Sequence, residues 1–126
     1  PKCNWLSEST KEIEIVSCGS ILIIQLIRFN CVNGVSIKNE NLFDCLGKPP
    51  YVLHIPLNPT DEVSFSNKYS LIATINHSGT TNNGHYWALI KHNDSEWYSC
   101  NDKSVIPISE AALKSKTAYV LFFKRV

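Results

Sequence analysis

Residues 69–90 read YSLIATINHSGTTNNGHYWALI, two apolar segments separated by a small polar loop. Both segments, Tyr69–Ile75 and Tyr86–Ile90, are rich in the aromatic and β-branched residues that favour β-strands. The loop between them contains two glycines, which would let it approach another polypeptide backbone closely. We therefore predict two strands, with the loop delivering His85 at the start of the second one.

Five other segments have the composition of strands. Lys11–Val16 alternates polar and apolar residues, and Ile21–Phe29 is a β-branched run with almost no polar interruption, which predicts a buried strand. Shorter aromatic and branched runs follow at Tyr51–Ile55, Trp97–Ser99 and Ala118–Phe123. The chain is therefore expected to be dominated by β-sheet.

Turn and helix signals connect these segments. Asn33-Gly34 is a favoured pair for a two-residue type I′ turn, so the chain should fold back there as a hairpin. The polar stretch Asn58–Lys68 predicts a surface connection. The lone helix candidate is Glu110–Lys114, which Ser109 could cap by accepting a hydrogen bond from a free N–H. The predicted fold class is α+β, mainly an antiparallel β-sheet with one short helix, in one unit over residues 1–126.

Composition narrows the possible partners. Charged residues make up 18% of the chain, below the roughly 25% of an average domain, so more surface than usual is expected to be apolar and to face a partner. The net charge of +1 comes from scattered Lys and Arg, which predicts neither nucleic acid nor an anionic membrane as a partner. The longest apolar run, Ile21–Ile24, is too short to cross a bilayer. Five cysteines, an odd number, favour reduced thiols in a cytoplasmic or nuclear protein.

His85 is the main candidate for chemistry. A general base needs a rigid mount and access to a cleft, and a histidine that begins a strand beside a small loop has both. Asn101 and Asp102 follow the next predicted strand, so antiparallel pairing can bring them beside His85. Either side chain could accept a hydrogen bond from the imidazole and leave its other nitrogen free to take a proton from a thiol. The alternatives are that His85 only begins a strand and that Asn101-Asp102 only forms a turn.

Several motifs together resemble the histidine box of ubiquitin-specific proteases, a family of papain-like cysteine proteases. In chain order they are Tyr69–Ala73, His77-Ser78-Gly79, Gly84–Ala88, Trp97-Tyr98, Asn101-Asp102 and Ala118–Arg125. Their order and spacing match the family. Leu22–Phe29 also resembles a family strand that usually ends in His-Leu-Lys-Arg-Phe, so the resemblance covers nearly the whole chain.

The resemblance implies the catalytic roles. His85 would be the general base, Asn101 the residue that orients it, and Asp102 a neighbour that supports the histidine or the oxyanion. The family's cysteine box, a glycine- and asparagine-rich turn into a helix, is absent from the chain, so residues 1–126 resemble only the C-terminal, sheet-bearing half of the catalytic domain. A helical subdomain of the same protein would supply the nucleophile. The chain alone is expected to be inactive and prone to association.

The resemblance also implies the substrate contacts. His77 and the loop up to Gly84 resemble a mobile loop that closes over the ubiquitin tail, and Tyr86 resembles part of the channel for the two terminal glycines of ubiquitin. The expected partners are ubiquitin or ubiquitinated proteins, and no cofactor is implied. Pro1-Lys2-Cys3 resembles the end of a zinc knuckle, but Cys3 lacks the paired cysteines that would complete four ligands, so no metal site is predicted.

The predicted function is deubiquitination, the thiol-dependent hydrolysis of the peptide or isopeptide bond after the C-terminal glycine of ubiquitin. Two alternatives remain, a non-catalytic ubiquitin-binding pseudoenzyme and a protease for a ubiquitin-like modifier. The presence of His85 with Asn101 and Asp102 argues against the first, because a pure binding surface needs no such arrangement. Gln25 and Ile27 stand where the family usually has His and Lys, which is typical of a divergent member.

Overall fold

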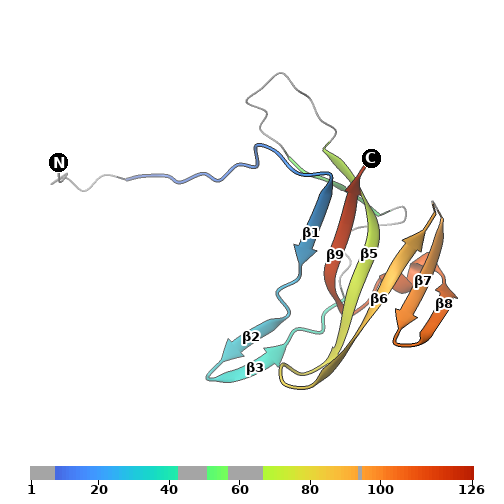
Figure 1. Ribbon diagram of the computed structural model, residues 1–126. Helices are drawn as coiled ribbons and strands as arrows, with labels where there is room; N and C mark the ends of the chain where they lie inside the picture. Colours follow the sequence, from blue (N-terminus) through green and yellow to red (C-terminus); the bar gives the residue numbers. More distant parts are fainter. Residues whose placement is uncertain (1–7, 43–50, 57–66, 94) are drawn as a thin grey trace.

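The computed structural model describes residues 8–42, 51–56, 67–93 and 95–126 (Figure 1). Within these ranges the elements are β1 Ile21–Gln25, β2 Phe29–Val32, β3 Val35–Lys38, β4 Val52–His54, β5 Lys68–Gly79, β6 Gly84–His92, β7 Glu96–Asn101, β8 Ser104–Ile108, a 3₁₀ turn Glu110–Leu113, and β9 Ala118–Arg125. The prediction of a mainly antiparallel sheet is therefore confirmed.

One large sheet carries most of the chain. Its strand order is β1-β9-β5-β6-β7-β8, and β4 pairs with the first residues of β5 (Figure 1). β5 is the central strand, since it pairs with β9 on one side and with β6 on the other. Its register with β9 shifts after Leu71 and again after Ile75, and such bulges bend a strand. The result is a curved sheet with long central strands.

The hydrophobic core covers one face of this sheet, which we call the core face. Phe123 and Leu71 are directly opposite each other in the β5–β9 register, and both are buried there. The complete set of buried apolar residues is Tyr51, Ile55, Tyr69, Leu71, Leu89, Trp97, Leu113, Ala118, Leu121 and Phe123. Because side chains alternate along a strand, every second residue of β6 and β7 counted from Leu89 and Trp97 also lies on the core face.

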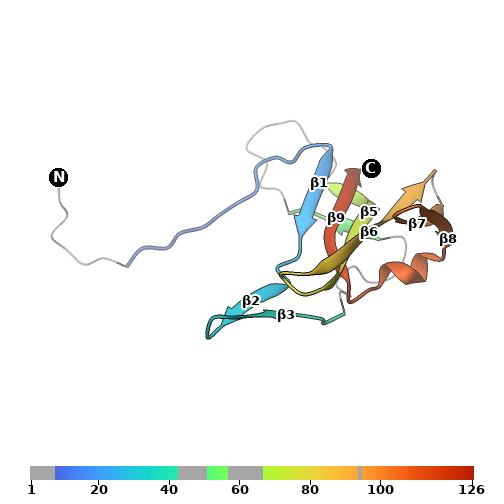
Figure 2. The ribbon, with the colours of Figure 1, turned by 60° about the horizontal axis from the view of Figure 1, so that its bottom comes forward.

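The second sheet is the small β2–β3 hairpin. Asn33 and Gly34 connect its strands with φ of 51° and 78°, so both central residues have the positive φ of a type I′ turn and the predicted hairpin is confirmed. Figures 1 and 2 both place this hairpin beside the loop that joins β5 to β6, at one end of the large sheet. The hairpin is thus close to the segment that leads into His85.

The predicted strand Lys11–Val16 is wrong. Among the described residues of this segment only Ile15 forms a β-bridge, and Figure 1 shows the chain running away from the sheet there. Ile13 has an exposed fraction of 84%. An alternating pattern yields a stable strand only where neighbouring strands accept its hydrogen bonds and cover its apolar face, and the described part of the chain supplies no such cover.

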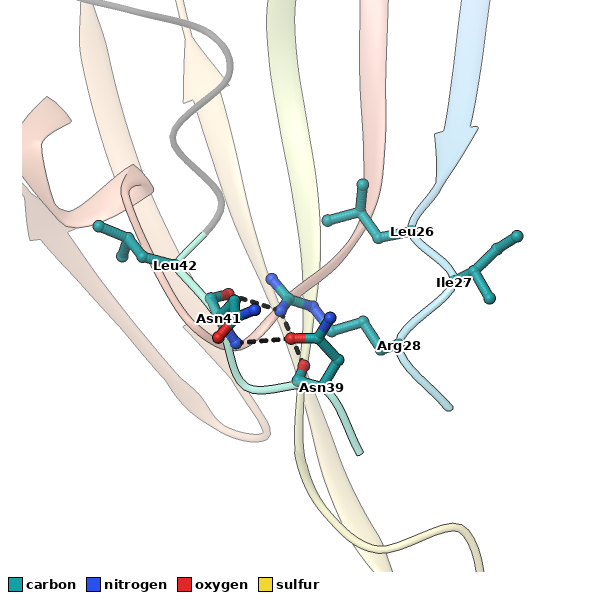
Figure 3. Close-up of a pocket in the computed structure, with 6 residues that line it drawn as sticks. All are labelled: Leu26, Ile27, Arg28, Asn39, Asn41 and Leu42. Carbon is teal, nitrogen blue, oxygen red and sulfur yellow. Dashed lines mark hydrogen bonds between the residues drawn. The ribbon is translucent and has the colours of Figure 1, made fainter. Parts of the chain in front are cut away.

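The predicted strand Ile21–Phe29 is also wrong in extent and in burial. It divides into β1 and β2, with a break at Leu26–Arg28, and Ile23 in the edge strand β1 is 59% exposed. The break occurs where Arg28 turns inward and donates to the carbonyl oxygens of Ala118 at 2.6 Å, Asn39 at 3.0 Å and Asn41 at 2.8 Å. Figure 3 shows the last two of these acceptors around the guanidinium group, at a pocket that Leu26, Ile27 and Leu42 also line.

Strands were predicted at the positions of β4, β5, β6, β7 and β9, and two further corrections concern the helix and β8. The helix is a single 3₁₀ turn, and Ser109 caps it through its backbone carbonyl, which accepts from Ala112 N–H at 3.0 Å, rather than through its side chain. β8 was not predicted because Pro107 has no N–H; it is tolerated in this terminal strand of the sheet. The predicted connection Asn58–Lys68 lies outside the described residues except for its last two, which lead into and begin β5.

Candidate functional site

His85 and Asn101 lie at the same end of two neighbouring strands. His85 is the second residue of β6, and Asn101 is the last residue of β7. Because the two strands are antiparallel, the start of one lies beside the end of the other. His85 precedes the buried Leu89 by four positions and Asn101 follows the buried Trp97 by four, so both side chains are on the core face.

The two side chains form a short hydrogen bond. His85 Nε2 lies 2.6 Å from Asn101 Oδ1. An amide oxygen only accepts, so a neutral imidazole donates from Nε2 and keeps Nδ1 as a proton acceptor. The side chain of His85 is 48% exposed, and the indole of Trp87 stacks against its ring with centroids 6.1 Å apart. The ring is therefore oriented by two neighbours and still open to a reaction partner.

Asp102 is near the imidazole without bonding to it. Its Oδ2 is 3.9 Å from His85 Nε2, beyond hydrogen-bond distance, and its side chain is 79% exposed. Asp102 lies in the turn after β7 and has a φ of 50°. Its backbone is therefore not extended, and its side chain does not continue the alternation of the strand. Residue types alone allowed either Asn101 or Asp102 as the partner of His85, and the resemblance implied Asn101; the hydrogen bond of His85 is with Asn101.

The predicted substrate residues His77 and Tyr86 lie on the face opposite His85. Tyr86 directly follows His85 in β6, and adjacent strand residues point to opposite faces. His77 is directly across from Tyr86 in the β5–β6 register, and their ring centroids are 4.5 Å apart. Phe29 and Tyr119 complete this aromatic cluster. The sequence did not associate those two rings with the site, because they come from segments far apart in the chain.

The loop before His85 is shorter than predicted. β5 extends to Gly79, so His77 belongs to the strand, is only 3% exposed, and the loop is limited to residues 80–83. Thr80 N–H donates to the Asn83 carbonyl at 2.7 Å to close it. A Cβ atom at Gly84 would overlap the His77 ring and the Ser78 carbonyl oxygen. Glycine is thus required at position 84 by close packing across the hairpin.

The pKa of His77 is lowered, first by burial of the imidazole and then by the positive charge of Lys38. Folding therefore favours the neutral form, and the unfolded chain, with an ordinary pKa near 6.5, binds the proton more readily. The contribution of neutral His77 to the free energy of unfolding is complete above pH 6.5, and it is lost as the pH falls through the lower pKa of His77 in the folded state.

We expect the free energy of unfolding of the protein that contains this chain to decrease between pH 7.5 and pH 5.5, measured by urea titration. Replacing His77 by Phe should flatten this dependence, because the ring contacts persist and the titrating group is gone. The exposed His92 is the matched control, and His92→Gln should leave the slope as in the wild type. An unchanged slope in His77→Phe contradicts the assignment.

The cysteines of the described residues do not approach this arrangement as a nucleophile would. Cys18, Cys31 and Cys100 are free thiols. Cys100 precedes Asn101 in β7, so its partly buried side chain points to the opposite face. Cys3 and Cys45 lie outside the described residues. Within the described ranges no cluster of three His, Cys, Asp or Glu side chains could hold a metal ion, and no helix has the length and apolar character to span a membrane.

The His85–Asn101 geometry would suit the base and the orienting amide of a Cys-His-Asn site, and comparisons with known proteins identify the family. Residues 2–123 match the family model described as ubiquitin carboxyl-terminal hydrolase. The chain is 33% identical over 133 residues to human ubiquitin carboxyl-terminal hydrolase 15, covering 99% of this chain and 12% of that protein. It is 32% identical over 131 residues to ubiquitin carboxyl-terminal hydrolase 8 of Saccharomyces cerevisiae, covering 97% of this chain and 27% of that protein. The chain thus spans between about an eighth and a quarter of the length of these relatives.

Solved structures give the same result for the fold. The SAGA DUB module of Ubp8, Sgf11, Sus1 and Sgf73 bound to monoubiquitin contains a chain that matches with a TM-score of 0.70 and 31% identity, over 85% of this chain and 23% of that one. The same module bound to ubiquitin aldehyde matches with a TM-score of 0.68 and 32% identity, over 85% and 24% of the two chains. The sheet, the His85–Asn101 pair and the family match over nearly every residue agree, and the chain belongs to the ubiquitin carboxyl-terminal hydrolase family, as its motifs led us to expect.

Proposed function

We propose that this chain supplies the general base for thiol-dependent hydrolysis of the bond after the C-terminal glycine of ubiquitin. The observation that carries the proposal is the 2.6 Å hydrogen bond between His85 Nε2 and Asn101 Oδ1 at the ends of two paired strands. In a member of this family that bond leaves Nδ1 as the atom that can accept a proton from a cysteine thiol.

The nucleophile comes from another part of the same protein, the helical subdomain implied by the resemblance. His85 Nδ1 takes the thiol proton, and the sulfur then attacks the glycine carbonyl carbon. The resulting imidazolium gives its proton to the departing lysine amine as the carbon–nitrogen bond breaks. Water, deprotonated by the same imidazole, hydrolyses the thioester and releases ubiquitin with a free carboxylate. Pairing with the imidazole lowers the thiol pKa from about 8.5 toward neutrality, so the reaction runs at cellular pH.

The substrate tail is proposed to run along the Gly79–Gly84 end of the β5–β6 hairpin. Gly84 packs closely against the His77 ring and the Ser78 carbonyl, which brings the two strands together at this end, and the 54% exposed Tyr86 offers an accessible ring beside it. His77 is buried beneath that ring, so it shapes this wall rather than touching substrate itself. Asp102, exposed beside the imidazole, is proposed to support the charge that develops on His85.

Ubiquitin and ubiquitinated proteins are the proposed partners, in the cytoplasm or nucleus. Support for ubiquitin comes from the matching Ubp8 modules, whose structures are described as bound to monoubiquitin or to ubiquitin aldehyde. The missing helical subdomain is the proposed cover for the apolar residues exposed in and before β1, which are Ile13, Ile15, Val16, Ile21 and Ile23. In the described part of the chain these residues have little else to bury them.

The test is covalent capture by ubiquitin that carries a thiol-reactive group at its C-terminus. The full-length protein should form a covalent adduct that is heavier by the mass of the ubiquitin probe. His85→Ala should slow formation of this adduct severely because the thiol is no longer deprotonated. Capture of a ubiquitin-like modifier in preference to ubiquitin would replace the substrate named above. Absence of an adduct with either probe would contradict the proposed hydrolysis.

Separate substitutions of Asn101 and Asp102 test which residue orients the base. We expect Asn101→Ala to lower kcat for a fluorogenic ubiquitin amide by roughly 10- to 100-fold, since it removes the acceptor that fixes the ring. Asp102→Ala should lower kcat by less than about tenfold, because exposed charges at this distance interact weakly. The reverse order of effects would assign the orienting role to Asp102.

A further inference from the structure

The β2–β3 hairpin makes polar contacts with the end of β5 and with the loop that joins β5 to β6. Lys38 Nζ donates to the His77 carbonyl oxygen at 2.8 Å. Ser36 Oγ and Thr81 Oγ1 are 2.5 Å apart, which joins the hairpin to the loop itself. Figure 2 shows β2–β3 and the β5–β6 loop side by side, as in Figure 1. The loop before His85 therefore receives contacts from the β2–β3 hairpin, in addition to those within the β5–β6 hairpin.

The carbonyl that Lys38 contacts lacks a strand partner for a geometric reason. His77 N–H donates to Thr117 O at 2.8 Å, on the side of β5 that faces β9. The N–H and C=O of one strand residue point to the same side, so the His77 carbonyl also faces that way. The β5–β9 pairing ends at Asn76 opposite Ala118. The Lys38 ammonium therefore takes the place of a strand donor, with a charge-assisted hydrogen bond.

The position of Lys38 is itself fixed. Its Nζ lies 5.9 Å from the centroid of the Phe29 ring, a cation–π distance, and Phe29 packs edge-on against His77 with centroids 5.7 Å apart. At the base of the hairpin the buried Arg28 binds carbonyl oxygens on both β9 and the segment after β3. The hairpin is thus anchored at its base and at the loop, and Lys38 is not a freely rotating surface lysine.

We propose that Lys38 is a positioning residue, which orders the residue 80–83 loop before substrate arrives by fixing the end of β5 at His77. This inference rests on the proposed function, because the loop flanks the general base and the proposed path of the ubiquitin tail. A loop that is already ordered loses less conformational entropy when it binds substrate. Removal of the Lys38 contact should therefore weaken substrate binding more than it slows the chemical step.

The variants are Lys38→Met, which keeps the length of the side chain and removes its donors, and Lys38→Arg, which keeps the charge and the donors. Lys124, exposed at the opposite end of the β9 and β5 strands, is the matched control, as Lys124→Met removes the same charge elsewhere. In the full-length protein, Lys38→Met should raise KM for a ubiquitin substrate about tenfold, the size expected for one lost hydrogen bond to a charged donor. Its kcat should change by less than about twofold, and Lys38→Arg should recover most of the loss.

Hydrogen exchange of the same proteins gives a second readout that does not depend on activity. Amides of residues 79–84 should exchange several-fold faster in Lys38→Met than in the wild type, while amides of β7 exchange as before. Unchanged exchange of the loop, or exchange in Lys38→Arg as fast as in Lys38→Met, overturns the positioning role. If the wild type does not act on ubiquitin but the loop still loosens in Lys38→Met, the proposed function fails and the positioning role stands.

Discussion

His85→Gln is expected to lower kcat/KM for a fluorogenic ubiquitin amide by at least about 10⁴-fold in the full-length protein, because removing one member of a catalytic unit removes most of its effect. Glutamine keeps a polar side chain that can still reach the Asn101 amide, so the sheet should fold as before. It has no group that can take a proton from a thiol near neutral pH. The loss should therefore appear in the chemical step while ubiquitin binding persists.

His92 provides the control for this substitution. It lies at the other end of β6, is exposed, and is seven positions from His85 on the same strand. His92→Gln should retain the wild-type kcat/KM within about twofold, as surface changes usually do. Retention of more than a tenth of the activity by His85→Gln would mean that another group serves as the base, and ubiquitin affinity measured by calorimetry would separate that case from a loss of binding.

Gly84→Ala is the second substitution with a large expected effect. The added methyl group would overlap the His77 ring and the backbone carbonyl of Ser78, and a backbone atom cannot rotate away as a flexible side chain can. Overpacking of this kind costs about 1–3 kcal/mol in the free energy of unfolding. Because Gly84 precedes His85, the strain should also displace the imidazole. The kcat of the folded variant should therefore be lower than that of the wild type, in addition to the loss of stability. Thermal unfolding and steady-state kinetics measure the two effects separately.

Gly19→Ala is the matched change for that comparison. A Cβ atom at Gly19 would have its closest contact at 3.6 Å, an ordinary van der Waals distance, and Gly19 is not among the residues with positive φ. The free energy of unfolding of Gly19→Ala should therefore lie within about 0.5 kcal/mol of that of the wild type. Equal stability of Gly84→Ala and Gly19→Ala would show that the β5–β6 hairpin relaxes without cost and that the close packing across it has no energetic role.

The sequence predicted the strands that contribute to the core but not the limits of β5. Asn76 and His77 are polar, so they indicated a loop, yet both are buried in the strand. Asn76 is satisfied by side-chain hydrogen bonds with Thr74 and Thr117, and the His77 backbone is satisfied by Thr117 and Lys38. Composition reports how often a residue type is exposed, and it does not report which tertiary partners will satisfy a buried polar group.

The site itself was predictable in part. The spacing of His85 and Asn101 on successive strands was enough to expect their contact, because antiparallel neighbours meet at fixed ends. Residue types did not distinguish Asn101 from Asp102, the resemblance implied Asn101, and the positive φ of Asp102 places that residue in the turn after β7. The approach of Lys38 to His77 was also beyond the sequence, as 39 positions separate the two residues. No local pattern encodes a contact of that range.

The placement of the proposed base, His85, and its proposed orienting residue, Asn101, on one β6–β7 hairpin has a consequence for how the site is assembled. His85 and Asn101 are 16 positions apart in the chain, so closing the loop between them costs little entropy compared with contacts that span a domain. We expect their hydrogen bond to form as soon as β6 and β7 pair, early in folding and before any distant segment docks. If the proposed function holds, the slow step in folding of the full-length protein would then be the arrival of the thiol at an imidazole that is already oriented.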